Sequence, residues 1–106
     1  NFIKATDRTI YLIDWDYSGM NHPMADFAAL FVEAAFTKEN QDYILDKYFN
    51  GNIPKNAFRK ILCYMILWDY LWAQWTVIKE AKGDDFGTYG HERYERAIKN
   101  LKKIRK

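Results

Sequence analysis

Two short β-favouring runs lie close to the N-terminus of this chain, and over the remainder the apolar residues recur at helical spacing. Residues 2–4 and 9–13 are short runs of β-favouring residues, and residues 5–8 between them have the composition of a turn. This pattern predicts a β-hairpin. Because antiparallel pairing holds opposed Cα atoms about 4.5–5.5 Å apart, Asn1 is expected to lie next to Asp14.

From residue 24 onward the apolar positions recur at helical spacing and predict four helices, over residues 24–36, 37–49, 54–82 and 92–104. Pro23 is favoured at the start of a helix, and Thr37 can cap the second one. Gly83 supplies a C-terminal stop for the third. The expected fold is mainly α, with a short N-terminal β-hairpin followed by about four helices in a single domain, residues 1–106.

The composition is that of a folded domain with a nearly balanced charge. Its 106 residues are 49% hydrophobic and 18% aromatic, enough for one modest core, and 16 basic against 14 acidic residues argue against a nucleic-acid partner. Cys63 is the single cysteine, in an apolar segment, so we expect a buried thiol and a reducing, cytoplasmic location. The basic last helix is expected to present a solvated face opposite an inner face of Tyr94, Ile98 and Leu101.

Residues 61–78 are the most apolar stretch and approach the length that spans a bilayer. Asp69 lies in the middle of this stretch, and a carboxylate at the centre of a membrane is costly. We therefore expect a buried helix of a soluble protein and no membrane insertion.

Two carboxylates, Asp14 and Asp16, follow the second strand and open a loop that contains Gly19. A carboxylate at a strand end suits a magnesium ion on nucleotide phosphates, since Mg²⁺ prefers hard oxygen ligands and takes few of them from the protein. Asp14 could equally cap the turn, because Asp is common in turns. Nearby, His22 is expected to be a solvated or capping residue, and Asp26 an acidic residue that favours a first helical turn.

An aromatic stripe runs along the predicted third helix. Its members fall within an arc of about 100° on the helix surface, and they are Tyr64, Trp68, Leu71, Trp72 and Trp75. Such a stripe is usually part of a core. Three indoles within eight residues also suit a quaternary ammonium, which aromatic faces can hold without a hydrogen bond.

Three segments, in order, resemble the choline and ethanolamine kinases of the protein-kinase-like superfamily, most of all the bacterial choline kinase type. Residues 13–18 resemble their Ile-Asp-[Phe/Trp]-[Glu/Asp]-Tyr-[Ser/Ala] stretch, the counterpart of Asp-Phe-Gly in protein kinases. Residues 71–77 resemble their Leu-Trp-x-x-Trp-[Ser/Thr]-[Ile/Val] segment, and residues 85–89 their [Glu/Asp]-Phe-Gly…Tyr stretch. The resemblance implies the C-terminal lobe of a protein-kinase-like fold, carrying the substrate-binding part of a phosphotransferase.

The resemblance also implies the roles of individual residues. Asn1, which looks like the end of the family's catalytic loop, would bind magnesium together with Asp14 and Asp16, and Asp14 would be the catalytic residue. The residues implied to contact the substrate are Tyr17, Glu33, Trp72, Trp75, Phe86 and Tyr89. Glu33 would face the substrate's positive charge, although periodicity alone also fits an exposed helix glutamate. Tyr89 matches the family's tyrosine only if a short deletion precedes it. Trp68 is expected to be a residue of the hydrophobic core.

The implied reaction is the transfer of the γ-phosphoryl group of ATP, with Mg²⁺, to the hydroxyl of choline or a related amino alcohol. Ethanolamine, thiamine-like alcohols and aminoglycosides are alternative substrates, and a non-catalytic helical module that binds choline or a protein helix is an alternative function. The chain lacks a Gly-rich nucleotide loop, a phosphate-binding Lys and a His-x-Asp motif. We therefore expect these 106 residues alone to be inactive and to self-associate through exposed apolar surface.

Overall fold

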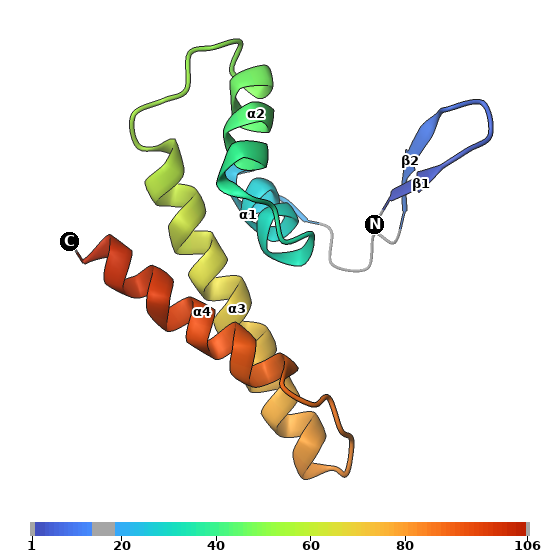
Figure 1. Cartoon of the computed structure of the whole chain (residues 1–106), viewed down its shortest axis with the longest axis vertical. Helices are drawn as coiled ribbons and strands as arrows, with labels where there is room; N and C mark the ends of the chain where they lie inside the picture. Colours follow the sequence, from blue (N-terminus) through green and yellow to red (C-terminus); the bar gives the residue numbers. More distant parts are fainter. Residues whose placement is uncertain (1, 14–18, 106) are drawn as a thin grey trace.

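The computed structural model describes residues 2–13 and 19–105, and in these it has a two-stranded antiparallel sheet and four helices (Figure 1). The elements are β1 (Phe2–Lys4), β2 (Ile10–Leu12), α1 (Pro23–Glu33), α2 (Lys38–Tyr48), α3 (Ala57–Ala81) and α4 (Tyr89–Ile104). The predicted fold class, a mainly α chain that begins with a β-hairpin, is confirmed.

The hairpin has the antiparallel pairing that the sequence predicts. Phe2 lies opposite Leu12, at the open end of the hairpin, and every residue of the two strands is exposed. Asn1 and Asp14 lie outside the described residues, so their proximity stays a prediction.

Side chains at the starts of α1 and α2 fix where these helices begin. His22 caps α1, since its Nδ1 accepts a hydrogen bond from the Met24 N–H at 3.1 Å. Thr37 and Asn40 form a capping box at α2: the Thr37 hydroxyl oxygen accepts from the Asn40 N–H at 3.2 Å, and the Asn40 side chain accepts from the Thr37 N–H at 3.4 Å. The expected capping roles of His22 and Thr37 are confirmed.

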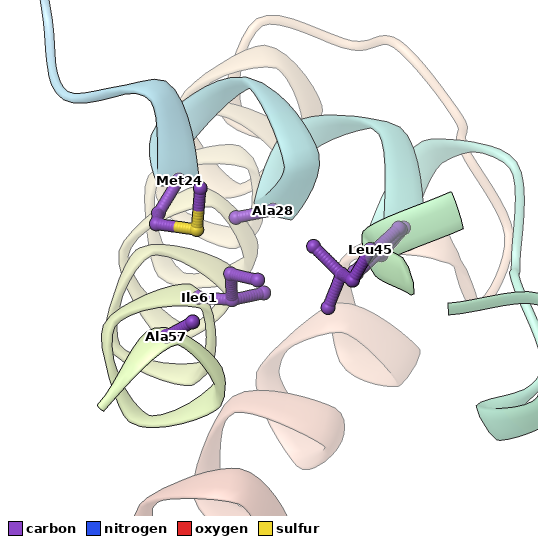
Figure 2. Close-up of a cluster of buried hydrophobic side chains, with 6 residues drawn as sticks. Met24, Ala28, Leu45, Ala57 and Ile61 are labelled. Atoms are coloured by element: carbon purple, nitrogen blue, oxygen red, sulfur yellow. The ribbon is translucent and has the colours of Figure 1, made fainter. Parts of the chain in front are cut away.

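The hydrophobic core lies where α1, α2 and α3 meet (Figure 2). Its fully buried members are Met24, Ala28, Phe31, Leu45, Ala57 and Ile61. Trp68 is half-buried and packs against this cluster, as expected of a core residue. The core therefore uses the N-terminal half of α3 and leaves the C-terminal half to pack against α4.

One face of α3 is covered by neither α1 nor α4. The predicted burial of Cys63 is wrong, because its thiol lies on this face and is exposed. Leu67, Leu71 and Ile78 are exposed as well, each more than half accessible. Within the described residues, α3 is the one helix long and apolar enough to cross a membrane, and 28% of its most apolar window is buried. The core helix of a soluble protein can have the same length and composition.

Gly90 marks a close approach of α4 to α3. A Cβ atom at Gly90 would lie 2.7 Å from Cγ2 and 2.9 Å from Cβ of Thr76. Thr76 is buried, and its hydroxyl donates to the Trp72 carbonyl at 2.8 Å, which fixes its rotamer. The helix consequently begins at Tyr89, before the predicted start at Glu92, because this glycine lets the first turn of α4 lie against α3.

We expect Gly90→Ala to lower the free energy of unfolding by about 1–3 kcal/mol, because the added methyl group overpacks this crossing. At an open helix position the same change would stabilise the protein by about 1 kcal/mol. A decrease in the free energy of unfolding would therefore identify overpacking as the cause. Urea unfolding of the full-length protein measures the effect. Gly19→Ala is the control, since no atom lies within 4 Å of the added Cβ. A Gly90→Ala protein as stable as the wild type would contradict the close crossing.

Candidate functional site

The C-terminal half of α3 and the loop that follows it bring three predicted substrate-binding aromatic residues together. The ring centroids of Trp72 and Trp75 lie 5.5 Å apart with the rings at 78°, and those of Trp75 and Phe86 lie 5.1 Å apart at 52°. All three side chains are half-buried. Lys79 Nζ lies 5.7 Å from the centroid of Trp75, so the cluster already attracts one cation.

The loop between α3 and α4 places Phe86 against Trp75. Gly87 has a φ of 59°, a left-handed conformation that favours glycine. Its N–H donates to the Asp85 carboxylate at 2.8 Å, which closes the turn around Phe86. The segment that the sequence singled out as a motif is thus a built turn that holds one wall of the aromatic cluster.

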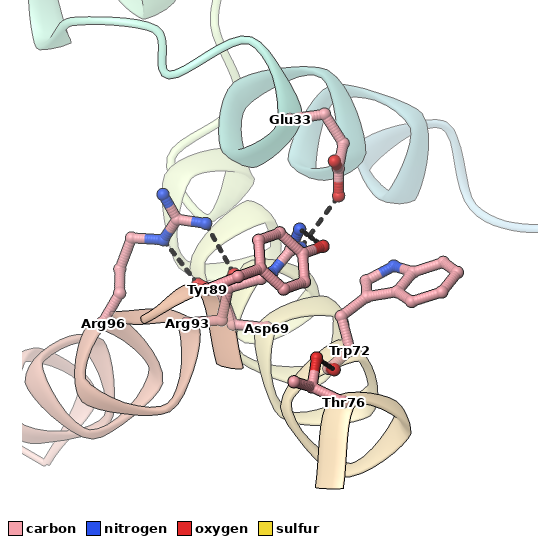
Figure 3. A network of polar contacts seen from close by, with 7 residues as sticks. All are labelled: Glu33, Asp69, Trp72, Thr76, Tyr89, Arg93 and Arg96. Carbon is pink, nitrogen blue, oxygen red and sulfur yellow. Dashed lines mark hydrogen bonds and ion pairs between the residues drawn. The ribbon is translucent and has the colours of Figure 1, made fainter. Parts of the chain in front are cut away.

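The other two described candidates, Glu33 and Tyr89, meet at a single guanidinium (Figure 3). Arg93 is only 5% exposed. Its Nη1 donates to the Tyr89 hydroxyl oxygen at 2.8 Å, and its Nη2 lies 2.8 Å from Glu33 Oε1. Glu33 itself is exposed, at the C-terminal end of α1, so its carboxylate faces both Arg93 and solvent.

Asp69 anchors this arrangement from α3 and is completely buried. Its Oδ1 accepts from Arg93 Nε at 3.0 Å and from Arg96 Nη2 at 2.6 Å, and its Oδ2 accepts from Arg96 Nε at 2.7 Å. These two arginines lie three residues apart, on the face of α4 that meets α3. A buried carboxylate is tolerated when it is paired in this way.

The predicted solvated basic face of α4 is therefore wrong in part, and so is its predicted inner face. Tyr94 and Leu101 are exposed by 46% and 40%, whereas Arg93, Ala97 and Asn100 are buried. The face that turns inward carries the arginine that pairs with Asp69, Arg93, and not Tyr94 or Leu101. The signal was present in the sequence, because an Asp inside an apolar helix needs a cationic partner and α4 carries arginines at helical spacing.

The carboxylates keep both arginines charged. For Arg93, burial opposes the charged form, but hydrogen bonding and charge from Glu33, with smaller contributions from Tyr89 and Asp69, raise its pKa above the usual value. Hydrogen bonding of Arg96 to the Asp69 carboxylate is the main reason that the pKa of Arg96 is raised. Both guanidinium groups are consequently charged across the physiological pH range.

A small hollow of about 170 Å³ opens beside this network, between α1 and α4. Its lining residues are Val32, Glu33, Tyr89, Glu92, Arg93 and Arg96. Charged groups dominate this lining, in contrast to the aromatic cluster on α3. The described part of the site thus combines aromatic rings on one helix with a polar, carboxylate-bearing hollow on its neighbours.

Four predicted site residues, Asn1, Asp14, Asp16 and Tyr17, lie outside the described residues. Within residues 2–13 and 19–105, no group of three or more His, Cys, Asp or Glu side chains could hold a metal ion. The magnesium ligands therefore stay a prediction from the sequence. Asp26, which was given only a structural role, is exposed in the first turn of α1.

The chain is similar to LicA proteins in sequence. No family model matches it. It is 34% identical to Protein LicA of Haemophilus influenzae strain Rd over 110 residues, an alignment that covers 98% of this chain and 41% of that protein. A second Protein LicA of Haemophilus influenzae is also 34% identical, with 98% of this chain and 32% of that protein covered. The chain spans less than half the length of these relatives.

Solved structures agree with the sequence comparison. The crystal structure of LicA in complex with AMP matches with a TM-score of 0.84 and 45% identity, over 98% of this chain and 36% of that one. The crystal structure of choline kinase LicA from Streptococcus pneumoniae matches with a TM-score of 0.84 and 48% identity, over 97% and 36% of the two chains. The predicted resemblance to choline kinases, over part of their length, is confirmed.

Proposed function

Because the chain shares sequence and fold with part of the LicA choline kinases, we propose that residues 1–106 are the C-terminal, substrate-binding part of such an enzyme. The intact protein would transfer the γ-phosphoryl group of ATP to the hydroxyl of choline, with Mg²⁺. It would act in the cytoplasm, in phosphocholine metabolism. The cluster of Trp72, Trp75 and Phe86 is the observation that carries this proposal.

The position of the cluster supports binding rather than core packing. Half-buried aromatic residues such as Trp68 pack against the core of α1, α2 and α3, and Trp72, Trp75 and Phe86 are not among them. Trp72 and Trp75 are half-buried, and the buried residue between them is Ala73. Rings that keep part of their surface accessible, set at a steep angle to one another, offer two walls to a cationic head group.

Choline suits such walls because its quaternary ammonium has no N–H to donate. It can be held by aromatic faces and by a carboxylate at longer range, for which Glu33 is the candidate. Holding the ammonium at a fixed place would present the hydroxyl group at the other end of the molecule to the phosphate donor. The tryptophans would in this way orient the alcohol as well as bind it.

Asn1, Asp14 and Asp16 are the proposed magnesium ligands, and Tyr17 follows them as a proposed substrate contact. Their oxygen atoms are of the type that Mg²⁺ prefers, and the ion would neutralise charge on the transferred phosphoryl group. The hairpin register supports the set, since Phe2, which follows Asn1 in sequence, lies opposite Leu12, two residues before Asp14. Asp14 would be the essential member of the set.

Substituting alanine for Trp72 or Trp75 in the full-length protein should raise the KM for choline by about tenfold or more. A cation held by a desolvated ring gains about 2 kcal/mol, and 1.4 kcal/mol corresponds to a factor of ten. The kcat should change less, because these rings bind the ground state and the transition state alike. Initial rates against choline concentration, at saturating ATP and magnesium, measure both constants.

Tyr70→Ala is the matched control for these variants. Tyr70 is an exposed aromatic residue of the same helix, and it lies on a different groove, lined also by Val77 and Tyr94. Its loss should leave the KM for choline unchanged. A KM that stays at the wild-type value in both tryptophan variants would rule out the aromatic cluster as the choline site.

A further inference from the structure

Arg93 joins the two described polar candidates of the site, and it does so from a buried position. One guanidinium contacts the carboxylate of Glu33, from α1, and the hydroxyl of Tyr89, from α4 (Figure 3). The ring of Tyr89 also lies under this guanidinium, with its centroid 5.4 Å from Arg93 Cζ. No role for Arg93 follows from the phosphotransfer chemistry itself.

Two carboxylates set the orientation of this guanidinium. Asp69 accepts from its Nε, while Glu33 lies against its Nη2, so the plane of the group is held at two corners. Because the fork of an arginine is rigid, fixing two corners also fixes the direction of Nη1 toward Tyr89. Arg93 thereby ties together side chains from three helices.

We propose that Arg93 is a positioning residue that makes the substrate site select a trimethylammonium group over a primary ammonium group. This inference rests on the proposed function, since it concerns the same pocket. Arg93 would act through Glu33 and Tyr89 rather than by touching the substrate.

The selection would depend on which hydrogen-bond acceptors remain for the ammonium group of the substrate. A primary ammonium has three N–H donors and loses free energy when it leaves water unless acceptors replace its hydration. Arg93 already uses Oε1 of Glu33 and the hydroxyl oxygen of Tyr89, and its positive charge offsets that of the Glu33 carboxylate. These two contacts reduce the number of acceptor sites and the net negative charge that Glu33 and Tyr89 offer to a primary ammonium.

A trimethylammonium group does not need those acceptors. Its charge is spread over methyl groups that pack against aromatic faces, and such faces are supplied here by Trp72, Trp75 and Phe86. Trp72 follows Asp69 by one helical turn, so this ring and the charged anchor share one side of α3. The same arrangement that binds the methylated cation thus penalises the unmethylated one.

The test compares choline with ethanolamine as substrates of the full-length protein, in the wild type and in Arg93→Met. The variant removes the guanidinium but leaves Asp69 paired with Arg96 through two hydrogen bonds, so the buried carboxylate keeps a partner. We expect the ratio of kcat/KM for choline to that for ethanolamine to fall about tenfold, as Glu33 and Tyr89 become free acceptors, each bond to a charged group being worth about 1.5–3 kcal/mol.

This ratio separates positioning from a merely structural role. Partial unfolding lowers the rates with both substrates equally and leaves their ratio unchanged, because both are measured on the same folded fraction. Lys99→Met is the matched control, an exposed position of α4, and its ratio should equal that of the wild type. If Arg93→Met yields no folded protein, Arg93→Gln takes its place, since its amide can still donate to Asp69 while the positive charge is gone.

The outcomes are distinct. A variant that phosphorylates choline and ethanolamine in the wild-type ratio overturns the role of Arg93 and leaves the proposed function intact. A wild-type protein that uses both alcohols equally well overturns the inference in the same way. A wild-type protein that phosphorylates neither alcohol overturns the proposed function, and the inference falls with it.

Discussion

Replacing Asp69 by alanine is expected to lower the free energy of unfolding by about 3–5 kcal/mol, a large part of the stability of an ordinary domain. The substitution leaves the guanidinium of Arg93 buried with one carboxylate partner fewer, and it removes both hydrogen bonds of Arg96 to α3. Most of the cost is the desolvation of cations that have lost the counter-charge of Asp69. Chemical denaturation of the full-length protein measures the loss.

Asp42→Ala is the control for this prediction, because it also breaks an ion pair between an acidic and a basic side chain. Asp42 pairs with Lys38 at 2.8 Å on the surface of α2, where the two side chains are 52% and 67% exposed. Its loss should cost only a few tenths of a kcal/mol. Similar losses in the two variants would show that the burial of Asp69 is not what makes its ion pairs important.

Substituting asparagine for Asp14 should reduce choline phosphorylation by the full-length protein at least about a hundredfold. The change keeps the size of the side chain but removes a charged oxygen ligand from the proposed magnesium site, and the ion contributes several kcal/mol to stabilising the transferred phosphoryl group. The effect should fall on kcat, since the aromatic walls that bind choline lie elsewhere. Initial rates of ADP formation measure it.

Asp26→Asn provides the comparison for this substitution. Asp26 is exposed in the first turn of α1, and only a structural role is assigned to it. Its activity should stay within about twofold of the wild type, since a first-turn charge affects helix stability by less than 1 kcal/mol. Full activity in Asp14→Asn would remove Asp14 from the catalytic site.

The elements of the fold were predictable because their signals are local. Pro23, Thr37 and Gly83 mark helix ends, and β-favouring runs and turn composition mark the hairpin, without reference to any distant residue. The helix bounds differ from prediction by three residues at the end of α1 and at the starts of α3 and α4. The first turn of α4 includes Gly90, which lies against Thr76. From sequence alone, a glycine in that position predicts a loop, because the packing of α3 on α4 is not known at that stage.

The charged network was not predictable from periodicity. Asp69 and Arg93 are 24 residues apart in sequence, and both lie on separate helices from Glu33. Their meeting depends on how α4 is rotated about its axis, which turns Arg93 inward and leaves Tyr94 exposed. Sequence reasoning therefore found the members of the site that match a motif, and missed the residue that connects them.

The aromatic stripe on α3 shows that helical spacing alone does not separate core residues from site residues. Its helical spacing placed Trp68 and Trp72 on one face, yet α1 and α2 cover only the N-terminal half of the helix. Trp68 consequently packs on the core, and the following tryptophans pair with each other and with Phe86. The division between core and site follows from helix packing rather than from residue type.

The formation of phosphocholine from choline, ATP and Mg²⁺ by the purified full-length protein is the decisive measurement, made with parallel calorimetric titration of choline. We predict that the wild type forms phosphocholine and binds choline, and that Trp72→Ala, folded to the same extent, binds choline at least about tenfold more weakly. A folded wild-type protein that neither binds choline nor yields phosphocholine would contradict the proposal that this chain carries the substrate site of a choline kinase.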